Sequence, residues 1–478
     1  MSPKVQTGSL EAGALDIVRR LVEHGHRALW AGGCVRDRLL GREAKDIDIA
    51  TDAVPEEVIA LFQTTLEIGK AFGVIAVRSG ERFYDVATFR RDEGGMDGRH
   101  PDRVRFTEER EDAQRRDFTV NALFYDPLRD ELLDYVEGRK DLDRRLIRAV
   151  GEPRVRFRED HLRMVRAVRF ASTLDFSLDA ETADAIRERA GDITHISVER
   201  IYSELNRLWT ESARAGEGLR LLRATGLLAV LLPEVHAMSG VEQPPQFHPE
   251  GDVFTHTAIM LDALPASPDP VLAWAVLLHD VGKPPTAEWS AGPKSEARWR
   301  FNEHDQVGAE ISKTILRRLK APSRMVESVE HCIRNHMRFG HADQMRESTV
   351  RRLVGHPLFP LELELHRLDC ECSHGDLRHV QFLREILDRL RAEPVLPEPR
   401  IRGEDILSLS VPKGPEVGRW LRTVYDRQLE HPEATREDLL TWLRAERVRE
   451  PASSSFPSGP LPVILNPHEP YAGDCPDV

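Results

Sequence analysis

The sequence predicts an α/β unit at the amino terminus, with a small mixed sheet and helices, followed by an all-α body and a second all-α domain. Up to about residue 150, short apolar strands alternate with helical patterns, and from about residue 153 to 448 the apolar spacing is helical throughout. A proline pair at 244–245 marks a boundary within the helical part. The first expected helix covers 9–26, and the expected strands cover 28–31, 46–50, 74–78 and 83–89.

A chain of 478 residues is too long for one hydrophobic core, so several domains are expected. The last stretch is rich in Pro, Ser and Gly and has little apolar periodicity, which is typical of a disordered tail. The predicted domains are an α/β head at 1–150, a helical body at 151–243, a second helical domain at 244–400, a carboxyl-terminal helical segment at 401–448 and the tail at 449–478.

The overall charge argues against a broad nucleic-acid-binding surface. The net charge is −13, so any contact with RNA must come from a local patch. Residues 139–169 form such a patch, with eleven cations against five acids. The five cysteines form no paired framework, and no apolar run is long enough to span a bilayer. We expect a cytoplasmic protein without a membrane partner, and we predict no oligomeric state.

A paired glycine and two nearby carboxylates carry the first chemical prediction. The turn at Gly32-Gly33 lets backbone N–H groups approach a phosphate, and Arg36 adds a cation. If residues 45–50 form a strand, Asp46 and Asp48 lie on the same face, because side chains alternate along a strand. Two carboxylates beside a phosphate-binding turn suit Mg²⁺ and a nucleoside triphosphate. This arrangement predicts nucleotidyl transfer.

Further residues extend this site. Asp85 places a third carboxylate in an apolar strand pattern and would assist catalysis, and Arg115 and Arg116 are suited to bind triphosphate oxygens. Either motif alone is weak evidence, because paired glycines and Asp-x-Asp are common in turns. The order of the glycine turn, the two aspartates and the third acidic residue favours the catalytic interpretation over an exposed acidic loop.

Four blocks then resemble one family, the class II tRNA nucleotidyltransferases, which include bacterial poly(A) polymerases. The resemblance covers about residues 25–230 and implies addition of CCA to the 3′ end of tRNA from CTP and ATP. The blocks are Gly32-Gly33-Cys34-Val35-Arg36-Asp37, Asp46-Ile47-Asp48, Arg115-Arg116-Asp117-Phe118-Thr119-Val120-Asn121-Ala122, and the segment from Glu159 to Phe170.

The last block is similar to the base-selecting helix of that family. At helical spacing, Asp160, Arg163 and Arg166 share one broad face, while Arg169 has drifted around the helix. Asp160 accepts and Arg163 donates hydrogen bonds, so the pair suits the edge of a cytosine or adenine base. The resemblance implies this role, with Arg166 and Arg169 in support. Taken alone, the block would be an ordinary salt-bridged surface.

The resemblance also implies roles for the residues that follow Arg116. Asp117 would lie near the nucleotide, and Asn121 would orient a hydroxyl group or the backbone. An alternative role for Asp117, compatible with the first, is that of a helix cap.

A second set of residues resembles the signature of HD-type metal phosphohydrolases. Imidazole and carboxylate ligands together suit Mn, Fe, Ni, Co or Zn. Whether this second site is catalytic, with a phosphatase or 2′,3′-cyclic phosphodiesterase activity, or only supports tRNA is left open. Its expected ligands are His256, His279, Asp280, His304, His336 and Asp369.

Three alternatives to CCA addition stay open. A poly(A) polymerase shares the catalytic motifs, although the segment 69–74 is more similar to the tRNA enzymes. An enzyme that adds only the terminal A is the second alternative. In the third, the HD site is the main activity and the head is a regulatory nucleotide-binding module.

Overall fold

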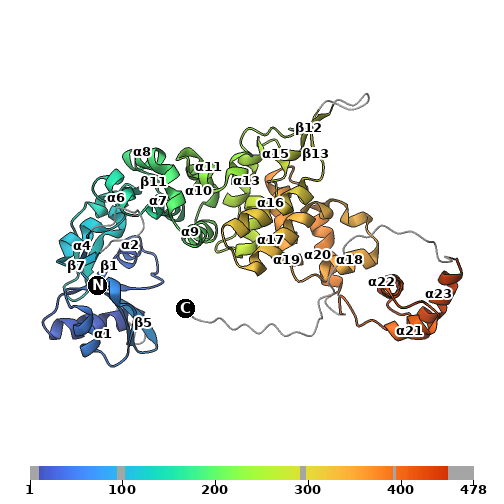
Figure 1. The fold of residues 1–478 in the computed structure, drawn as a ribbon, viewed down its shortest axis with the longest axis horizontal. Helices are drawn as coiled ribbons and strands as arrows, with labels where there is room; N and C mark the ends of the chain where they lie inside the picture. Colours follow the sequence, from blue (N-terminus) through green and yellow to red (C-terminus); the bar gives the residue numbers. More distant parts are fainter. Residues whose placement is uncertain (1–9, 94–102, 291–297, 391–393, 450–478) are drawn as a thin grey trace. The chain divides into compact units, whose positions relative to one another are not determined.

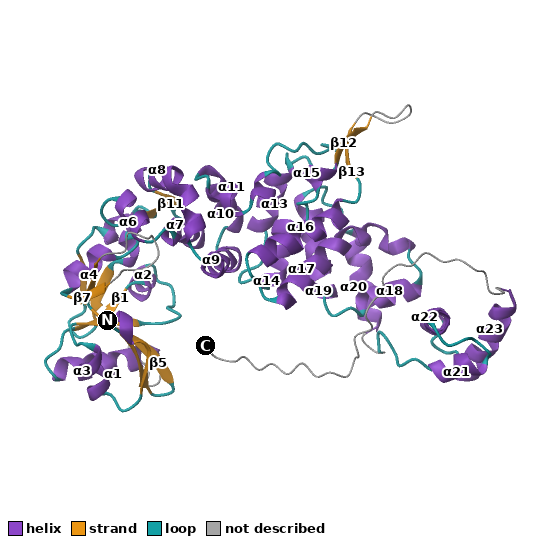
Figure 2. Cartoon of the chain, viewed as in Figure 1, coloured by secondary structure: helices purple, strands orange, loops and turns teal. Residues whose placement is uncertain are grey.

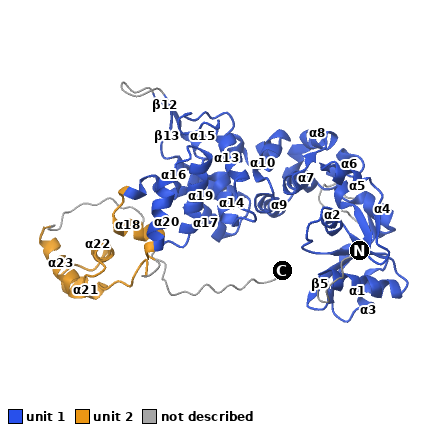
Figure 3. Cartoon of the chain, turned by 180° about the vertical axis from the view of Figure 1, so that it is seen from behind, with its two compact units in different colours: residues 1–343, 356–388 blue, residues 344–355, 389–478 orange. Residues whose placement is uncertain are grey.

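The computed structural model describes residues 10–93, 103–290, 298–390 and 394–449, so the predicted tail from residue 450 onward lies outside the described residues. The chain divides into two compact units, which Figure 3 colours separately. The first unit comprises residues 1–343 and 356–388, and the second comprises 344–355 and 389–478. Within the described ranges, every helix is too short or too polar to cross a membrane.

The first unit begins with a seven-stranded mixed sheet (Figures 1 and 2), which confirms the predicted α/β head. Only β2 and β5 are parallel neighbours, and the other strand pairs are antiparallel. In spatial order the strands are β3 (Thr65–Gly69), β4 (Val74–Ser79), β5 (Arg82–Thr88), β2 (Asp48–Thr51), β1 (Ala28–Ala31), β8 (Leu123–Asp126) and β9 (Glu131–Asp134).

Helices and short segments complete the head. Helix α1 buries Ile17, Val18 and Leu21 at helical spacing, which places its apolar stripe in the core. A separate two-stranded sheet pairs β6 (Arg90–Glu93) with β7 (Arg103–Phe106). The helical segments of the head are α1 (Leu10–Glu23), α2 (Gly33–Leu39), α3 (Pro55–Leu61), η1 (Lys70–Phe72), α4 (Glu109–Arg115), η2 (Thr119–Asn121) and α5 (Gly138–Asp143).

One strand differs from its prediction. The strand expected over 46–50 begins only at Asp48, so Asp46 precedes it. Ile47 is buried with its side chain in the core, and the chain enters the sheet after it. The position of Asp46 therefore depends on the loop before β2.

The helical body after residue 150 is confirmed. A short parallel pair, β10 (Leu146–Ile147) and β11 (Ser177–Leu178), interrupts it. Helices α7 and α9 pack against each other and join one continuous core with the head. The helical segments are α6 (Pro153–Glu159), α7 (Leu162–Leu174), α8 (Ala180–Arg189), η3 (Ala190–His195), α9 (Val198–Glu211), α10 (Ala215–Ala224), α11 (Leu227–Leu231) and α12 (Pro233–His236).

The second helical region is built around α14 (Pro270–Leu278). This helix is apolar on all sides and buried from Leu272 to Leu278, as expected for a helix surrounded by others. A hairpin of β12 (Ala287–Ser290) and β13 (Arg298–Phe301) projects from this region (Figure 1). The other helical segments are α13 (Val253–Asp262), α15 (Lys283–Thr286), α16 (His304–Arg318), α17 (Ser323–Asn335), η4 (His336–Gln344), α19 (Phe359–Cys372) and α20 (Arg378–Leu390).

The second unit has a small core of its own. Trp420 and Val424 of α22 pack with Leu439 and Leu443 of α23. Helix α18, which precedes α19 in the chain, belongs to this unit through its contacts with α22. The helices of this unit are α18 (Glu347–Val354), α21 (Gly403–Ser408), α22 (Pro415–Glu430) and α23 (Arg436–Arg449).

Candidate active sites

The glycine turn connects β1 to α2 at the edge of a cationic site. Gly32 has φ 78°, a conformation that favours glycine, and its N–H donates to the Leu123 carbonyl at 3.0 Å. A Cβ at Gly32 would lie 2.9 Å from Nη1 of Arg116. The missing side chain therefore lets the end of β1 approach the Arg116 guanidinium.

Strand pairing brings the first carboxylates together. Asp48 pairs with Ala31, the last residue before the turn, and its neighbour Ile49 pairs with Val86 of the parallel strand β5. This register places Asp48 beside Asp85, the residue before Val86. Two strands that are far apart in the sequence thus deliver their acidic residues to one edge of the glycine turn.

The three aspartate carboxylates repel one another. Burial and the carboxylates of Asp46 and Asp85 raise the pKa of Asp48 to about 6, and Arg116 opposes this shift only in part. Burial and Asp46 also raise the pKa of Asp85. Carboxylate oxygens are the ligands that Mg²⁺ prefers, and a cation would relieve their mutual repulsion. The residues present therefore fit a divalent cation.

Arg115 and Arg116 are held by an acid that the sequence analysis missed. Asp112 is 1% exposed, and its Oδ1 accepts from Nη2 of Arg115 at 2.7 Å. Its Oδ2 accepts from Nε of Arg116 at 3.1 Å. Although burial opposes ionisation, the two guanidinium groups lower the pKa of Asp112. The spacing of three and four residues within one helix was the sequence pattern that indicated this pairing.

A hydrogen-bonded chain connects the glycine turn to the helical body. Nη1 of Arg36 donates to Oδ1 of Asn121 at 2.6 Å, and Nδ2 of Asn121 donates to Oδ1 of Asp117 at 3.3 Å. Oδ2 of Asp117 accepts from Nε and Nη2 of Arg166 at 3.0 and 2.8 Å. Four residues of the predicted site thus belong to one network. Their side chains position the guanidinium of Arg36 instead of lying loose in solvent.

The network ends in a buried ion pair. Nη1 of Arg166 donates to Oε1 of Glu204 at 3.3 Å, and Nε of Arg169 donates to Oε2 of Glu204 at 2.6 Å. Arg169 is only 2% exposed, so its charge lies inside the body. Glu204 is on α9, and its sequence neighbourhood gives no indication that it serves two arginines of α7.

Asp160 and Arg163, the predicted base-selecting pair, do not lie on one helix. Asp160 has an extended backbone after α6 (φ −147°), and α7 begins at Leu162, so the predicted shared helix face of Asp160 and Arg163 is wrong. Asp160 instead accepts hydrogen bonds from the Leu162 N–H at 3.0 Å and from Nη2 of Arg200 at 2.9 Å. Its local role resembles a helix cap.

The side chain of Arg163 bonds to the end of α6 and to the end of α4. Its Nη1 donates to Oε2 of Glu159 at 2.7 Å, and its Nη2 donates to the Arg115 carbonyl at 3.2 Å. Arg163 thus lies against the segment that carries the triphosphate arginines. Asp160 and Arg163 are both partly exposed, which leaves them accessible to a ligand.

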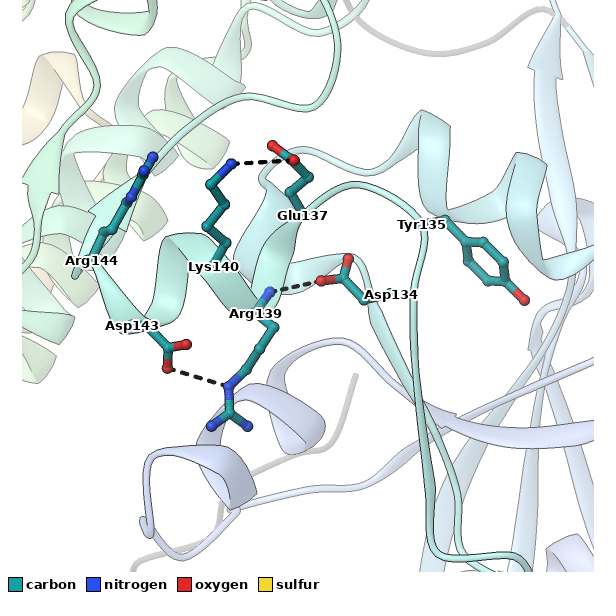
Figure 4. A pocket seen from close by; sticks show the side chains of 7 residues that line it. All are labelled: Asp134, Tyr135, Glu137, Arg139, Lys140, Asp143 and Arg144. Atoms are coloured by element: carbon teal, nitrogen blue, oxygen red, sulfur yellow. Dashed lines mark hydrogen bonds and ion pairs between the residues drawn. The ribbon is translucent and has the colours of Figure 1, made fainter.

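Part of the basic segment lines a pocket of about 600 Å³ on α5, which Figure 4 shows. Two of its three cations are paired with acids locally. Nε of Arg139 lies 3.2 Å from Oδ1 of Asp143, and Nζ of Lys140 lies 3.3 Å from Oε1 of Glu137. The excess of cations in the sequence therefore overstates the charge that this pocket offers to RNA.

The six predicted HD residues converge from five places in the helical region. They form two groups in which the potential ligand atoms lie within 4.8 Å of one another. His256 lies on α13 and Asp369 on α19, while His279-Asp280 follows α14, His304 begins α16 and His336 follows α17. The groups are His256, His279 and Asp369, and Asp280, His304 and His336.

Three of these imidazoles are oriented by the backbone. Nδ1 of His279, His304 and His336 lies 2.9, 2.7 and 2.6 Å from the carbonyl oxygen three residues earlier. Each Nδ1 must therefore carry a proton when the ring is neutral, which leaves the Nε2 lone pair for a metal. Nε2 of His304 and Nε2 of His336 face each other at 3.3 Å, where two lone pairs repel without a cation.

Buried polar atoms support the same conclusion. Nε2 of His279 and Oδ2 of Asp280 lie 3.1 Å apart, and neither makes a hydrogen bond of good geometry within the described chain. Burial, then the neighbouring imidazoles of His304 and His279, lower the pKa of His336 to about 4, so this ring is neutral at pH 7. Neutral imidazole with carboxylate is the donor set of a divalent transition metal, and these residues fit one.

Two further residues of this centre were missed by the sequence analysis. Oε1 of Glu250 lies 2.6 Å from Nδ1 of His256, a second carboxylate beside this ring in addition to Asp369. Burial opposes protonation of His256, but the two carboxylates raise its pKa to about 9. Nζ of Lys283 lies 2.7 Å from Oδ2 of Asp280. The spacing of three residues between Asp280 and Lys283 was the available indication in the sequence.

Three family models match separate parts of the chain. Residues 28–148 match the family model of the poly A polymerase head domain. Residues 175–239 match a probable RNA- and SrmB-binding site of polymerase A, and residues 252–392 match the HD domain.

The chain is similar to CCA-adding enzymes. Those of Geobacillus thermodenitrificans and Bacillus subtilis are 46% and 45% identical over 219 and 196 residues, or 46% and 41% of this chain. These matches span about half of the curated relatives, 54% and 49% of their lengths. The structure of the Bacillus stearothermophilus CCA-adding enzyme with CTP is 29% identical, with a TM-score of 0.68, and the match covers 94% of this chain and 98% of that one.

Proposed function

We propose that this chain adds C, C and A to the 3′ end of tRNA, with CTP and ATP as substrates. The observation that carries the proposal is the group of three mutually repelling aspartates beside Gly32 and the Arg116 guanidinium. A site that fits a cation next to a cationic turn suits a metal-bound triphosphate. The similarity to CCA-adding enzymes supports tRNA as the acceptor. A cytoplasmic location would follow from that substrate.

Each residue of the site has a separate role in this proposal. Asp46, Asp48 and Asp85 would hold Mg²⁺, which when bound activates the tRNA 3′-hydroxyl and stabilises the leaving pyrophosphate. Gly32, Gly33 and Arg116 would cradle the triphosphate. The hydrogen-bonded chain through Asn121 and Asp117 holds Arg36 in place for the same ligand. Asp160 and Arg163 would choose the base, with Arg115, Arg166 and Arg169 fixing the surrounding frame.

We expect incorporation of labelled CTP and ATP into three tRNA transcripts that end before CCA, after C and after CC. With Mg²⁺, each transcript should be completed to CCA, and extension should stop there, because the proposed protein template is a site of fixed size. Extension of the CC-ending transcript alone would indicate an A-adding enzyme. Long A tracts on unrelated RNA would indicate a poly(A) polymerase, and no incorporation would contradict the proposal.

We further propose that the HD centre is a metal-dependent phosphohydrolase that acts on 2′,3′-cyclic phosphate or phosphate ends. The two groups of imidazole and carboxylate ligands, with Nε2 of His304 and Nε2 of His336 facing each other at 3.3 Å, support a metal centre of this kind. Mn, Fe, Ni, Co or Zn would fit, and such a metal supplies an activated water when bound.

The HD activity is tested by release of phosphate or opening of the cyclic ester by chelator-treated protein reloaded with single metals. We expect His279→Ala to lower hydrolysis by at least about 100-fold, because it removes a metal ligand, and to leave CCA addition unchanged. His341→Ala, a change at an exposed histidine nearby, is the matched control. Equal hydrolysis by His279→Ala and the parent protein would contradict the proposal.

A further inference from the structure

A third group of possible ligands lies outside both sites. His331 is on α17, His356 is in the turn before α19, and Glu362 is in the first turn of α19. One potential ligand atom from each lies within 4.8 Å of those of the other two. We propose that these residues form a separate Zn²⁺ site that joins α17 to the start of α19.

The carboxylate is the strongest observation. Glu362 is 1% exposed, and neither of its oxygens has a hydrogen-bond partner among the residues that the structure describes. Burying an ionised carboxylate without partners is costly, so such groups are normally paired or bound to a metal. Nε2 of His331 lies 3.2 Å from Oε1 of Glu362, yet the two atoms do not meet the geometry of a hydrogen bond.

The distance fits two ligands of one ion. With metal–nitrogen and metal–oxygen bonds of about 2.0–2.1 Å, neighbouring ligands of tetrahedral Zn²⁺ are about 3.3–3.4 Å apart. The observed 3.2 Å between Nε2 and Oε1 is close to this value. An ion between the two atoms would satisfy the carboxylate, which has no hydrogen bond within the described residues.

The second imidazole stacks on the first and comes within reach of the same ion when its ring turns. The rings of His331 and His356 are nearly parallel, with centroids 4.1 Å apart and planes inclined by 9°. Nδ1 of His356 accepts a hydrogen bond from the Leu358 N–H at 3.2 Å, and a metal bound at this atom would replace that long contact. Both imidazoles are partly exposed, so an ion has a path from solvent, and a water molecule would complete the tetrahedron.

The types of ligand atom at this site indicate which ion it would bind. Two imidazoles and one carboxylate suit Zn²⁺, whereas Mg²⁺ and Ca²⁺ prefer oxygen ligands throughout. The site would connect residues 331, 356 and 362, which lie on separate segments of the same compact unit. Its contribution would be to the stability of these segments, because the site contains no residue of the head or of the HD centre.

The test counts bound metal in the full chain. Protein stripped with a chelator and reloaded with Zn²⁺ is desalted, and zinc per chain is measured by mass spectrometry. All variants carry Asp280→Asn, so that binding at the HD centre is reduced equally throughout. We expect His331→Ala/His356→Ala to bind one equivalent less than its parent, and His341→Ala to bind the same amount as the parent.

A second variant tests the site independently, in case His331→Ala/His356→Ala does not fold. Glu362→Gln keeps the shape of the side chain and removes its charge, and we expect its Zn²⁺ affinity at this site to fall by at least about tenfold in a competition with a chelating dye. Incorporation of CTP and ATP should be unchanged in both variants. Zinc content and affinity equal to those of the parent, in either correctly folded variant, would overturn the proposal.

Discussion

Asp48→Asn is expected to reduce nucleotide incorporation on the order of 1000-fold, equivalent to about 4 kcal/mol of transition-state stabilisation. Asp48 is central to this site because it lies at the start of β2, opposite the end of β1 and beside Asp85 of β5. An amide of the same shape cannot supply the charge that binds a divalent cation. The measurement is single-turnover addition of labelled ATP to the CC-ending transcript at saturating Mg²⁺. Asp16→Asn, at an exposed acid of α1, is the control.

The same variant should be more stable than the parent protein when metal is absent. The pKa of Asp48 is raised from 3.8 to about 6, so its protonated form favours the folded state. This contribution is fully present below pH 3.8 and is lost as the pH rises through 6. Metal-free protein should therefore lose thermal stability between about pH 4 and 7, and Asp48→Asn should reduce that loss. A lower melting temperature of Asp48→Asn at pH 7 would contradict this explanation and would attribute the lost activity to misfolding.

The sequence predicts those parts of the head that depend on local patterns. Strand 28–31 and the turn at Gly32 follow from apolar spacing and glycine chemistry, and the structure places them as expected. Asp46 was assigned to a strand from the alternation of side chains, but β2 begins only at Asp48. Ile47 and Ile49 are both buried, so the alternation is present although strand pairing starts two residues later than predicted.

Long-range partners are the part that a single sequence does not reveal. Glu204 lies 35 residues after Arg169, and only the packing of α7 against α9 makes it the partner of Arg169 and Arg166. The pairing of Asp160 with Arg200 has the same origin. By contrast, the HD residues were predicted together, because their chemistry is unusual enough to be recognised before the helices are assembled.

The buried pair of Arg169 and Glu204 leads to the largest expected effect on stability. Arg169→Met should lower the free energy of unfolding by about 3–5 kcal/mol, because it leaves Oε2 of Glu204 without its 2.6 Å partner in a buried environment. The substitution also removes the guanidinium that lies 4.1 Å from the centre of the Phe170 ring. The measurement is urea-induced unfolding followed by circular dichroism.

Two further proteins separate the lost ion pair from a general effect of removing an arginine. Arg207→Met removes an exposed arginine from an i,i+4 pair with Glu211 on α9, and it should cost less than about 1 kcal/mol. Arg169→Met/Glu204→Leu should recover much of the stability lost by Arg169→Met, because no buried charge is left unpaired and Arg166 keeps its two bonds to Asp117. If the double variant is less stable than Arg169→Met by a further 2 kcal/mol or more, Glu204 stabilises the body through contacts other than the pair, and the explanation from an unpaired buried charge is wrong.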